Sequence, residues 1–464
     1  MRTRERVLLI NPSMQTYYEQ MKVKSAITQS PPLNIAVVAG ALLRAGHEVR
    51  ALDLDGEPWR EKELPQLLRQ FDPGLVGITF RTPVFREAKR LAAQVRLGAP
   101  HARLIAGGVH ASVRPEEVVQ GPFDIAVINE GDLTILELAA GKPLEEIPSI
   151  CFLKDGLPFR TPERTTLVEL DGLAYPAWQL FDIKPYRRQS LVARHPPVVD
   201  LESSRGCPAK CIYCTQTIFG EGFRGKSPRR FVQEVEAALQ FGFKSFNLVD
   251  DSFTTDIRRA IAVCEELLAK RIQVPWTLTN GIRVSHTNED FFKIAAKAGL
   301  SVVAFGLETG SQKLLNTVGK GATLNQARRA VSQARSNGIT TVGYFMVGLP
   351  GEDQETLQAT VEFARELDLD FAKFSITVPL PGTALFDRWE PYINQENYHN
   401  FNIHKASRGT FENPGLSWEE IETFLKRAYR AFYFRRDYLY KRFTRDLKEG
   451  NLLFNARAAL EIQW

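Results

Sequence analysis

Three closely spaced cysteines are the residues of this chain best suited to chemistry. Cys207, Cys211 and Cys214 follow the pattern Cys-x3-Cys-x2-Cys, in a chain that has five cysteines in all. Thiolates are soft ligands that suit zinc and iron–sulfur clusters. A structural zinc site requires a fourth protein ligand, but the next cysteine is Cys264, in a helical pattern, and the next histidine is His286. The pattern therefore favours a cubane cluster with one open iron; the alternative is three loop cysteines without a metal.

The composition sets limits on where such chemistry could operate. A chain of 464 residues is long enough for two or three domains. A net charge of +5 spread over this length does not indicate a nucleic-acid partner, which would require a clustered basic face. Cysteines clustered in this way indicate a reducing compartment, and the apolar run 7–10 is too short for a signal peptide. The sequence thus predicts a cytoplasmic protein without a transmembrane segment.

Residues 1–145 are predicted to form a doubly wound, Rossmann-like α/β domain. Short apolar runs at 7–10, 49–54, 75–80, 103–106 and 124–128 alternate with helical patterns, which indicates a parallel sheet covered on both faces. Ligands bind beyond the carboxyl ends of the strands in such sheets, where Gly107 and Gly108 lie. The glycine pair is equally compatible with a plain tight turn. No Gly-x-Gly-x-x-Gly follows the first strand, which disfavours a dinucleotide site.

Residues 146–195 are rich in proline and are predicted to be a partly structured connecting segment. From residue 196 to 385 the alternation returns, and six βα units predict a partial (β/α)6 barrel of the TIM type. The expected strands are 198–201, 245–249, 276–280, 302–305, 341–346 and 371–378, with helices at 231–240, 257–270, 289–298, 325–337 and 354–367. The three cysteines directly follow the first of these strands, on the face where such barrels carry their chemistry. Capping boxes are predicted at Thr323 with Gln326 and at Thr287 with Asp290.

The C-terminal region, 386–464, is predicted to be helical. Ser417 and Glu420 form a further capping box, and residues 431–443 combine aromatic side chains with arginines. One interpretation is a helix packed on the barrel with its basic residues in solvent. The other is an apolar substrate wall, or a contact with a membrane surface, that involves Tyr433, Phe434 and Tyr438.

The cysteine pattern, with an aromatic residue before the last cysteine, resembles the signature of the radical S-adenosylmethionine (SAM) enzymes. Over nearly the whole chain the motifs are similar to the cobalamin-binding branch, which is class B methyltransferase-like. That branch has a Gly-Gly-x-His-Ala-Ser/Thr turn, found here at 107–112, and a Gly-Glu-Gly turn, for which this chain has Asn129-Glu130-Gly131. The Asp-x-His-x-x-Gly motif that supplies an axial histidine in other cobalamin proteins is absent from the sequence.

The resemblance implies cofactors and contacts. Cys207, Cys211 and Cys214 would be the catalytic and metal-binding residues of a [4Fe–4S] cluster. SAM contacts would come from Tyr213, Asp250, Asp251, Arg283, Glu308, Gly343, Met346 and Pro379. Glu308, in Gly-Leu-Glu-Thr-Gly-Ser, is the most specific of these matches. Alternatives without a ligand are helix caps or solvated turns for Asp250 and Asp251, and a surface pair with Glu289 or Asp290 for Arg283.

Cobalamin contacts would come from Asn11, Pro12, Thr79, Thr82, Gly107, Gly108, Val109, His110, Glu130 and Gly131. His110 is interpreted as a contact to the cobalamin tail or as a surface residue, not as a cobalt ligand. Thr79 and Thr82 would lie at the lower face of the corrin.

By the same resemblance the protein is expected to be an enzyme that cleaves SAM and methylates an unactivated carbon of a small-molecule or lipid-like substrate. An electron donor such as flavodoxin or ferredoxin is an expected partner, and the oligomeric state is left open. Three alternatives remain: a cyclase or rearranging enzyme, a radical SAM enzyme without cobalamin, and a non-enzymatic iron–sulfur or cobalamin sensor.

Overall fold

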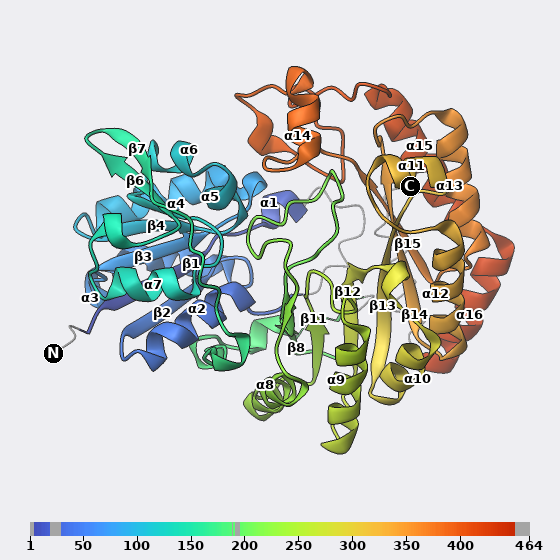
Figure 1. The fold of residues 1–464 in the computed structure, drawn as a ribbon, viewed down its shortest axis with the longest axis horizontal. Coiled ribbons are helices and arrows are strands. Elements are labelled where there is room, and N and C mark those ends of the chain that lie inside the picture. The colour runs from blue at the N-terminus through green and yellow to red at the C-terminus, as the bar shows by residue number, and fades with distance from the viewer. Residues whose placement is uncertain (1–3, 19–28, 188, 191–194, 451–464) are drawn as a thin grey trace.

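The computed structural model describes residues 4–18, 29–187, 189–190 and 195–450. Two sheets lie side by side, one in the N-terminal part of the chain and one in the central part (Figure 1). The expected α/β architecture, with a doubly wound sheet followed by a partial barrel, is confirmed. None of the described helices is long and apolar enough to cross a membrane.

The first sheet has the strand order β2-β1-β3-β4-β5-β6-β7. Its parallel part matches the 2-1-3-4-5 order of flavodoxin-like folds, and consists of β1 (Arg6–Asn11), β2 (Glu48–Asp53), β3 (Leu75–Thr79), β4 (Arg103–Gly107) and β5 (Ile125–Val127). Helices α2 (Leu33–Arg44) and α7 (Asp132–Ala139) contribute to the core on one face. Helices α3 (Leu64–Phe71), α4 (Phe85–Gly98) and α6 (Pro115–Val119) contribute to the core on the other face. Because successive side chains of each strand enter different cores, the strands are continuous apolar runs.

The predicted connecting segment contributes two strands to this sheet. β6 (Ile150–Lys154) pairs antiparallel with β5, and β7 (Leu157–Arg160) pairs antiparallel with β6. They are joined by Asp155 and Gly156, both at positive φ. Asp-Gly between two strands is a strong hairpin signal, and it was outweighed by the prolines around it. Cys151, on β6, is fully buried.

The second sheet is an all-parallel half-barrel in the order β15-β14-β13-β12-β11-β8. The strands are β8 (Val198–Leu201), β11 (Ser245–Leu248), β12 (Trp276–Ile282), β13 (Leu300–Glu308), β14 (Thr340–Val347) and β15 (Phe371–Ile376). The connecting helices, on the outer side in Figure 1, are α8 (Pro228–Phe241), α9 (Ile257–Ala269), α10 (Glu289–Lys297), α12 (Leu324–Ser336) and α13 (Gln354–Glu366). All six strands and five helices were predicted; a short helix, α11 (Gln312–Thr317), was not.

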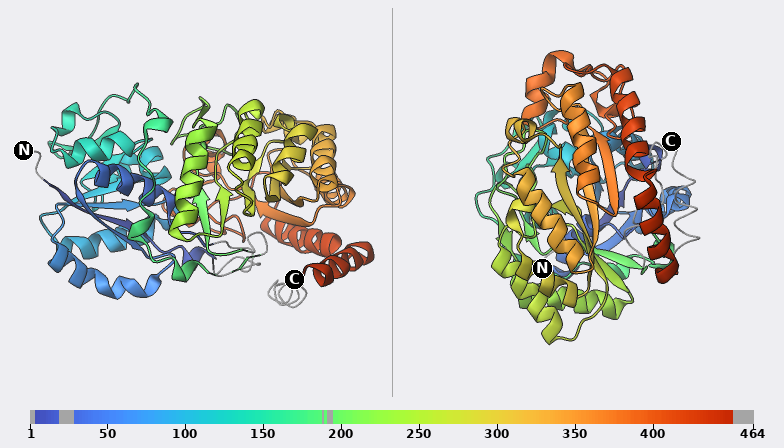
Figure 2. Two further views of the ribbon diagram at one scale, coloured as in Figure 1. Left: turned by 90° about the horizontal axis from the view of Figure 1, so that it is seen from below. Right: turned by 90° about the vertical axis from the view of Figure 1, so that its right-hand side faces the viewer.

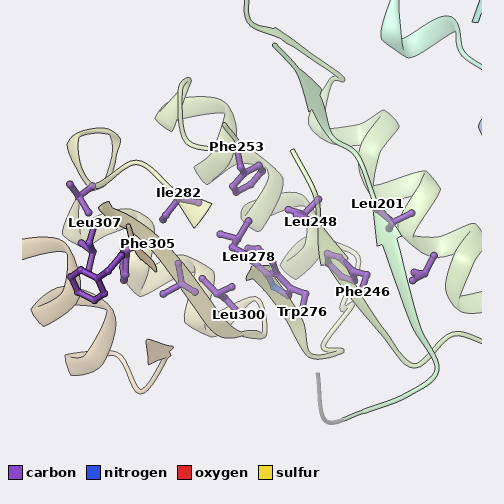
Figure 3. Packing of buried hydrophobic residues seen from close by; sticks show 14 of the residues in the cluster. Leu201, Phe246, Leu248, Phe253, Trp276, Leu278, Ile282, Leu300, Phe305 and Leu307 are labelled. Atoms are coloured by element: carbon purple, nitrogen blue, oxygen red, sulfur yellow. The ribbon is translucent and has the colours of Figure 1, made fainter. Parts of the chain in front are cut away.

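Aromatic packing fixes the layer between these strands and their helices (Figure 3). The ring of Trp276 on β12 stacks on that of Phe246 on β11, with centroids 5.7 Å apart. Its indole Nε1 donates a hydrogen bond to the Ala298 carbonyl at 2.9 Å, which satisfies the one polar atom of a fully buried side chain. This layer holds the strands in register, and so positions the residues at their carboxyl ends.

The capping box at Thr323 and Gln326 is confirmed, whereas the one at Thr287 and Asp290 is wrong. Asn288 caps α10 instead: its side chain accepts a hydrogen bond from the Phe291 backbone N–H at 2.8 Å. The hydroxyl of Thr287 donates to the Val284 carbonyl. Asparagine is preferred over threonine as an N-cap, so Asn288 was a better candidate than Thr287.

The C-terminal region is less helical than predicted. Helix α14 (Ala384–Trp389) is followed by a largely irregular stretch, and then by α15 (Trp418–Tyr433), with its predicted capping box, and α16 (Arg436–Glu449). The α15 and α16 helices run along the outside of the second sheet (Figure 2). The remainder of the predicted helical region, 451–464, lies outside the described residues.

Tyrosines of α15 cover the free edge of β15. The Tyr429 hydroxyl accepts from the Phe374 N–H and donates to the Phe374 carbonyl, both at 3.2 Å. The Tyr433 hydroxyl does the same at Ala372, at 3.0 and 2.9 Å. Positions i and i+4 of a helix face the same side, as do positions i and i+2 of a strand, so the two spacings match. An apolar substrate wall made by Tyr433 and Tyr438 is therefore wrong: Tyr438 is buried too, and its hydroxyl donates to the Asp370 carbonyl.

We expect Tyr433→Phe to destabilise the half-barrel, because two backbone groups of β15 would lose their hydrogen-bond partner. The expected cost is about 1–3 kcal/mol, or a fall in melting temperature of about 2–8 °C. Thermal unfolding followed by circular dichroism measures it. Tyr440→Phe is the control, since Tyr440 is 72% exposed; equal melting temperatures for the two variants would contradict the proposed covering of the edge.

Candidate active site

The three cysteines lie on the loop 206–223, called here the cysteine loop, which connects the short strands β9 (Ser204–Arg205) and β10 (Arg224–Gly225). All three thiols are free, and Cys207 and Cys211 are partly buried. Cys214 retains exposed surface, yet the pKa of its thiol is raised, first by desolvation and then by the nearby Cys211 and Cys207. The loop therefore gathers all three sulfurs in one place.

This donor set fits an iron–sulfur cluster better than a single metal ion. No three His, Cys, Asp or Glu side chains of the described residues converge on one ion position. In a cubane cluster each thiolate binds a different iron, so the sulfurs need not converge on one point. Gly206, at φ +83°, brings the two limbs of the loop together: a Cβ there would lie 2.2 Å from the Gly222 carbonyl oxygen. The loop is thus shaped by its backbone to present three thiols without a fourth.

Asp250 and Asp251, which follow β11, hold the start of this loop. The Asp250 carboxylate accepts from the Ser203 backbone N–H and hydroxyl, both at 2.6 Å, and from the Ser204 hydroxyl at 2.5 Å. Asp251 accepts from the Gly206 backbone N–H at 3.2 Å. The structure therefore engages both predicted SAM-contacting carboxylates with the loop itself. Asp250 is buried and is not a solvated turn residue, whereas Asp251 remains exposed. The helix that follows is capped by Asp256.

Glu308 and Lys320 form a buried ion pair at the carboxyl end of β13. The Lys320 Nζ donates to Glu308 Oε1 at 2.5 Å, and both side chains are about nine-tenths buried. Glu308 has φ +64° and lies at an irregularity in the pairing of β13 with β14. Burial raises the pKa of the Tyr213 hydroxyl well above its usual value, and Glu308 and Cys211 are the next causes. A buried carboxylate, an ammonium and a phenol thus adjoin the cysteine loop.

The remaining predicted SAM contacts are distributed around this ion pair. Arg283 donates to the Lys320 carbonyl at 2.5 Å, so a surface pair with Glu289 or Asp290 is not formed. Met346 packs in one apolar cluster with Tyr213, and Pro379 is buried just beyond β15. Gly343 turns away from the group: a Cβ there would lie 2.5 Å from the Leu369 side chain, in the layer between strands and helices. Lys320 was missed, although Gly-Lys-Gly at 319–321 was a visible signal.

The predicted cobalamin contacts gather at one edge of the first sheet. Asn11 with Pro12, Thr79, and Gly107 with Gly108 stand at the carboxyl ends of β1, β3 and β4, which are adjacent strands. A Cβ on Gly107 would meet no atom within 4 Å, so there is open space beyond the end of β4. Gly108, at φ +92°, lies against the Phe80 backbone, where a Cβ would come within 2.7 Å of the carbonyl oxygen. This edge leaves space for a flat ligand at Gly107, and requires glycine at 108 for the turn itself.

His110 points into the protein interior. It is 0% exposed and packs against the rings of Phe85 and Tyr398. Its Nδ1 lies 3.1 Å from the Thr82 hydroxyl. Burial, followed by the charge of Arg114, lowers the pKa of the His110 imidazole to about 3. The interpretation of His110 as a surface residue is therefore wrong, because Val109 begins the short helix α5 (Val109–Val113) and the next side chain turns inward.

A buried arginine joins the two domains at the cysteine loop. Arg205, two residues before Cys207, is 3% exposed. Its guanidinium donates to Glu130 and to Asp132 of the first domain, both at 2.8 Å, and to Glu202 at 2.7 Å. Burial alone would lower the pKa of Arg205, but Glu202, Asp132 and Glu130 raise it well above its usual value.

Glu130, predicted to contact cobalamin, is also paired with Arg224 at the other end of the cysteine loop. Both ends of the loop are thus bound to the segment that follows β5, through Glu130 and Asp132. Sequence reasoning missed Arg205, because its first-domain partners are 73 and 75 residues away along the chain.

Comparison with known proteins agrees with this division of the chain. Residues 201–364 match the model of the radical SAM superfamily, and residues 23–139 match that of the B12-binding domain. This chain combines a B12-binding domain with a radical SAM domain. The predicted family is therefore confirmed.

Similar proteins in this branch include methyltransferases and a cyclase. An uncharacterized methyltransferase of Pyrococcus horikoshii is 29% identical over 94% of each chain. The anaerobic magnesium-protoporphyrin IX monomethyl ester cyclase of Rubrivivax gelatinosus is 26% identical over 92% of this chain and 78% of its own. Among solved structures, the radical SAM methyltransferase TsrM of Kitasatospora setae, with cobalamin and a [4Fe–4S] cluster bound, has a TM-score of 0.68 at 22% identity. That match covers 84% of this chain and 75% of TsrM.

We expect Glu130→Gln to loosen the cysteine loop from the other domain, because Arg205 and Arg224 would lose a charged partner. Amides of residues 206–222 should then exchange with solvent about tenfold faster in hydrogen–deuterium exchange mass spectrometry. Glu117→Gln is the matched control: Glu117 is in the same domain and accepts from the Tyr398 hydroxyl without touching the loop. Equal loop exchange in both variants would show that the Arg205 network does not position the loop.

Proposed function

We propose that this protein is a cobalamin-dependent radical SAM enzyme, and that its reaction is methylation of an unactivated carbon. The observation that carries the proposal is the cysteine loop: it holds three free thiols, lies beside the buried ion pair, and is flanked by arginines that bind the B12-binding domain. The proposed cluster ligands are Cys207, Cys211 and Cys214. When bound, the cluster and SAM would supply a 5′-deoxyadenosyl radical, and cobalamin would supply the methyl group.

The residues of the chain would bind, orient and exclude water. The Glu308 carboxylate is suited to accept from the amine or the ribose of SAM, because a charge-assisted hydrogen bond is strong in a buried site. The Lys320 ammonium group holds that carboxylate in place. Asp250 and Asp251 hold the cysteine loop, and Tyr213 and Met346 close the apolar side of the same region. In the first domain, the Gly107 turn would seat the corrin, with Asn11, Pro12, Thr79 and Thr82 beside it.

The second candidate reaction is cyclisation, favoured by the similarity to the cyclase of Rubrivivax gelatinosus. Both reactions begin with the same SAM cleavage, so the site residues proposed here serve either. The substrate is proposed to be a small molecule and the reductant a flavodoxin or ferredoxin, in the cytoplasm.

The cluster assignment is tested by metal analysis after anaerobic purification with cobalamin supplied. We expect about four irons and about one cobalt per chain, with 5′-deoxyadenosine formed from SAM under dithionite. Replacing Cys207, Cys211 or Cys214 by Ala should abolish iron binding and SAM cleavage. Cys264→Ala, which alters a buried thiol on α9, should retain both. Iron retained by all three loop variants would refute the cluster assignment.

The cobalamin site is tested separately by Gly107→Leu. A leucine there would extend into the open space beyond β4, so we expect cobalt to be lost and iron to be retained. Gly172→Leu is the control, because a Cβ at Gly172 also meets no atom within 4 Å, on an exposed turn away from the strand ends. A Gly107→Leu variant with full cobalt content would show that the corrin does not bind at the Gly107 turn.

A further inference from the structure

One lysine on the inner face of the half-barrel, Lys373, has no hydrogen-bond or ion-pair partner among the described residues. Along β15 the side chains alternate: Ala372 and Phe374 enter the core beneath the outer helices. Phe371 belongs instead to a separate cluster with Val302, Ala304 and Val342 on the inner face. Lys373 therefore lies between two outward-facing residues and shares the inner face with Phe371. In barrels of this type, substrates bind at the face formed by the carboxyl ends of the strands. Lys373 lies three residues before the carboxyl end of β15, and its long side chain lies below that face.

Strand register places Lys373 close to the proposed SAM site. Lys373 is paired with Tyr344 on β14, and Tyr344 with Gly306 on β13. Its Nζ lies 5.9 Å from the centroid of the Tyr344 ring. A Cβ on Gly306 would lie 2.7 Å from the Lys320 Nζ and 2.8 Å from Glu308 Oε1, so the ion pair lies directly over that glycine. Lys373 on β15 is therefore level with Gly306 on β13, two strands away, and the Glu308–Lys320 ion pair lies over Gly306.

The segment of the first domain that follows β1 approaches Lys373 from the other side. Lys373 is close enough to His404 to lower the pKa of that imidazole, which burial brings to about 3. The ring of His404 in turn packs edge-on against that of Tyr17, with centroids 5.7 Å apart. Tyr17 belongs to the short helix α1 (Gln15–Tyr18), just after the predicted cobalamin contacts Asn11 and Pro12. Lys373 therefore stands between the proposed SAM site and the B12-binding domain.

The absence of a hydrogen-bond or ion-pair partner among the described residues distinguishes Lys373, which is half-buried, from two lysines that are fully buried. Lys226 pairs with Glu234 at 2.7 Å, and Lys320 pairs with Glu308. Among the described residues, no carboxylate or carbonyl oxygen lies within bonding distance of the Lys373 Nζ, and burial lowers the pKa of its ammonium group. The carboxylate on the inner face of β8, Asp200, is held by Asn247 at 2.9 Å. Burying an ammonium without a partner is costly, so such a group gains most from an anionic ligand.

We propose that Lys373 is the anion-binding residue of the substrate site. Its Nζ donates to a carboxylate or phosphate of the substrate, and an apolar part of the substrate lies against Tyr344; the Phe371 ring is already covered by the Arg442 guanidinium, 4.6 Å from its centroid. The substrate class is then an organic anion with an apolar body. This inference deepens the proposed function and rests on it for the reaction that follows binding.

The test compares two probes that differ by one anionic group. 8-Anilinonaphthalene-1-sulfonate carries a sulfonate, and N-phenyl-1-naphthylamine is the same molecule without it. Each is equilibrated by dialysis against the anaerobic holoenzyme with SAM, and the free probe is read in the protein-free chamber, away from absorbing cofactors. Lys373→Met removes the charge at similar length, Lys373→Arg retains it, and Lys405→Met is a control at an exposed lysine.

We expect Lys373→Met to raise the Kd of the sulfonate probe about tenfold, and that of the neutral probe less than about twofold. Lys373→Arg should recover most of the affinity, and Lys405→Met should match the wild type. The proposal is overturned if the wild type does not bind the sulfonate probe, if Lys373→Met binds it equally well, or if both probes weaken by the same factor. Formation of 5′-deoxyadenosine by the wild type is measured in parallel, so a failure of the radical SAM assignment is seen independently of the probes.

Discussion

The buried guanidinium of Arg205 is the interaction on which the arrangement of the two domains depends. A charge removed from water is stable only when its partners stay in place, and breaking such a group costs about 3–5 kcal/mol. Glu202 comes from the same strand region as Arg205, whereas Glu130 and Asp132 come from the other domain. Any motion that separates the domains at this point would therefore leave buried charges unpaired. The cysteine loop and the β5 turn must move together.

Under the proposed function, the reaction requires the two domains to be held in a fixed arrangement. A radical reaction followed by methyl transfer requires the substrate to be presented to two cofactors held by different domains, at fixed separation. A misplacement of about 1 Å can cost two orders of magnitude in rate. A bidentate arginine is suited to this task, because its planar fork fixes direction as well as distance. The second contact, from Arg224 at the far end of the loop, fixes the loop against rotation about Arg205.

Much of the fold could be predicted because its signals are local. The parallel strands of both sheets are short apolar runs that alternate with helical patterns, and the cysteine spacing is contained in one loop. The β6–β7 hairpin was missed because its edge strand is largely exposed, and so lacks an apolar run. Asn288 was overlooked as a cap because the neighbouring Thr287 matched the same template.

The site was only partly predictable, for a different physical reason. The carboxylates of Asp250 and Asp251 were identified, but their partners are the backbone and hydroxyls of residues 203–206, which no local pattern specifies. Lys320, Arg205 and Lys373 act through neighbours brought close by tertiary structure. Their importance follows from burial, which the type and spacing of residues do not reveal. Functional residues that belong to sequence motifs can be recognised in the sequence. Residues whose role depends on burial can be recognised only in the structure.

The tyrosine hydroxyls along β15 have a consequence for how the protein behaves in a crowded solution. A sheet that stops at six strands has two free edges, each a template for pairing with a strand of another chain. On β15, Tyr429 and Tyr433 occupy the backbone groups that such a strand would use; on β8, the Ser30 hydroxyl accepts from the Asp200 N–H at 2.9 Å. Side chains thus replace the missing strands of a closed barrel. The half-barrel can therefore remain open without exposing an edge strand that would promote aggregation through strand pairing.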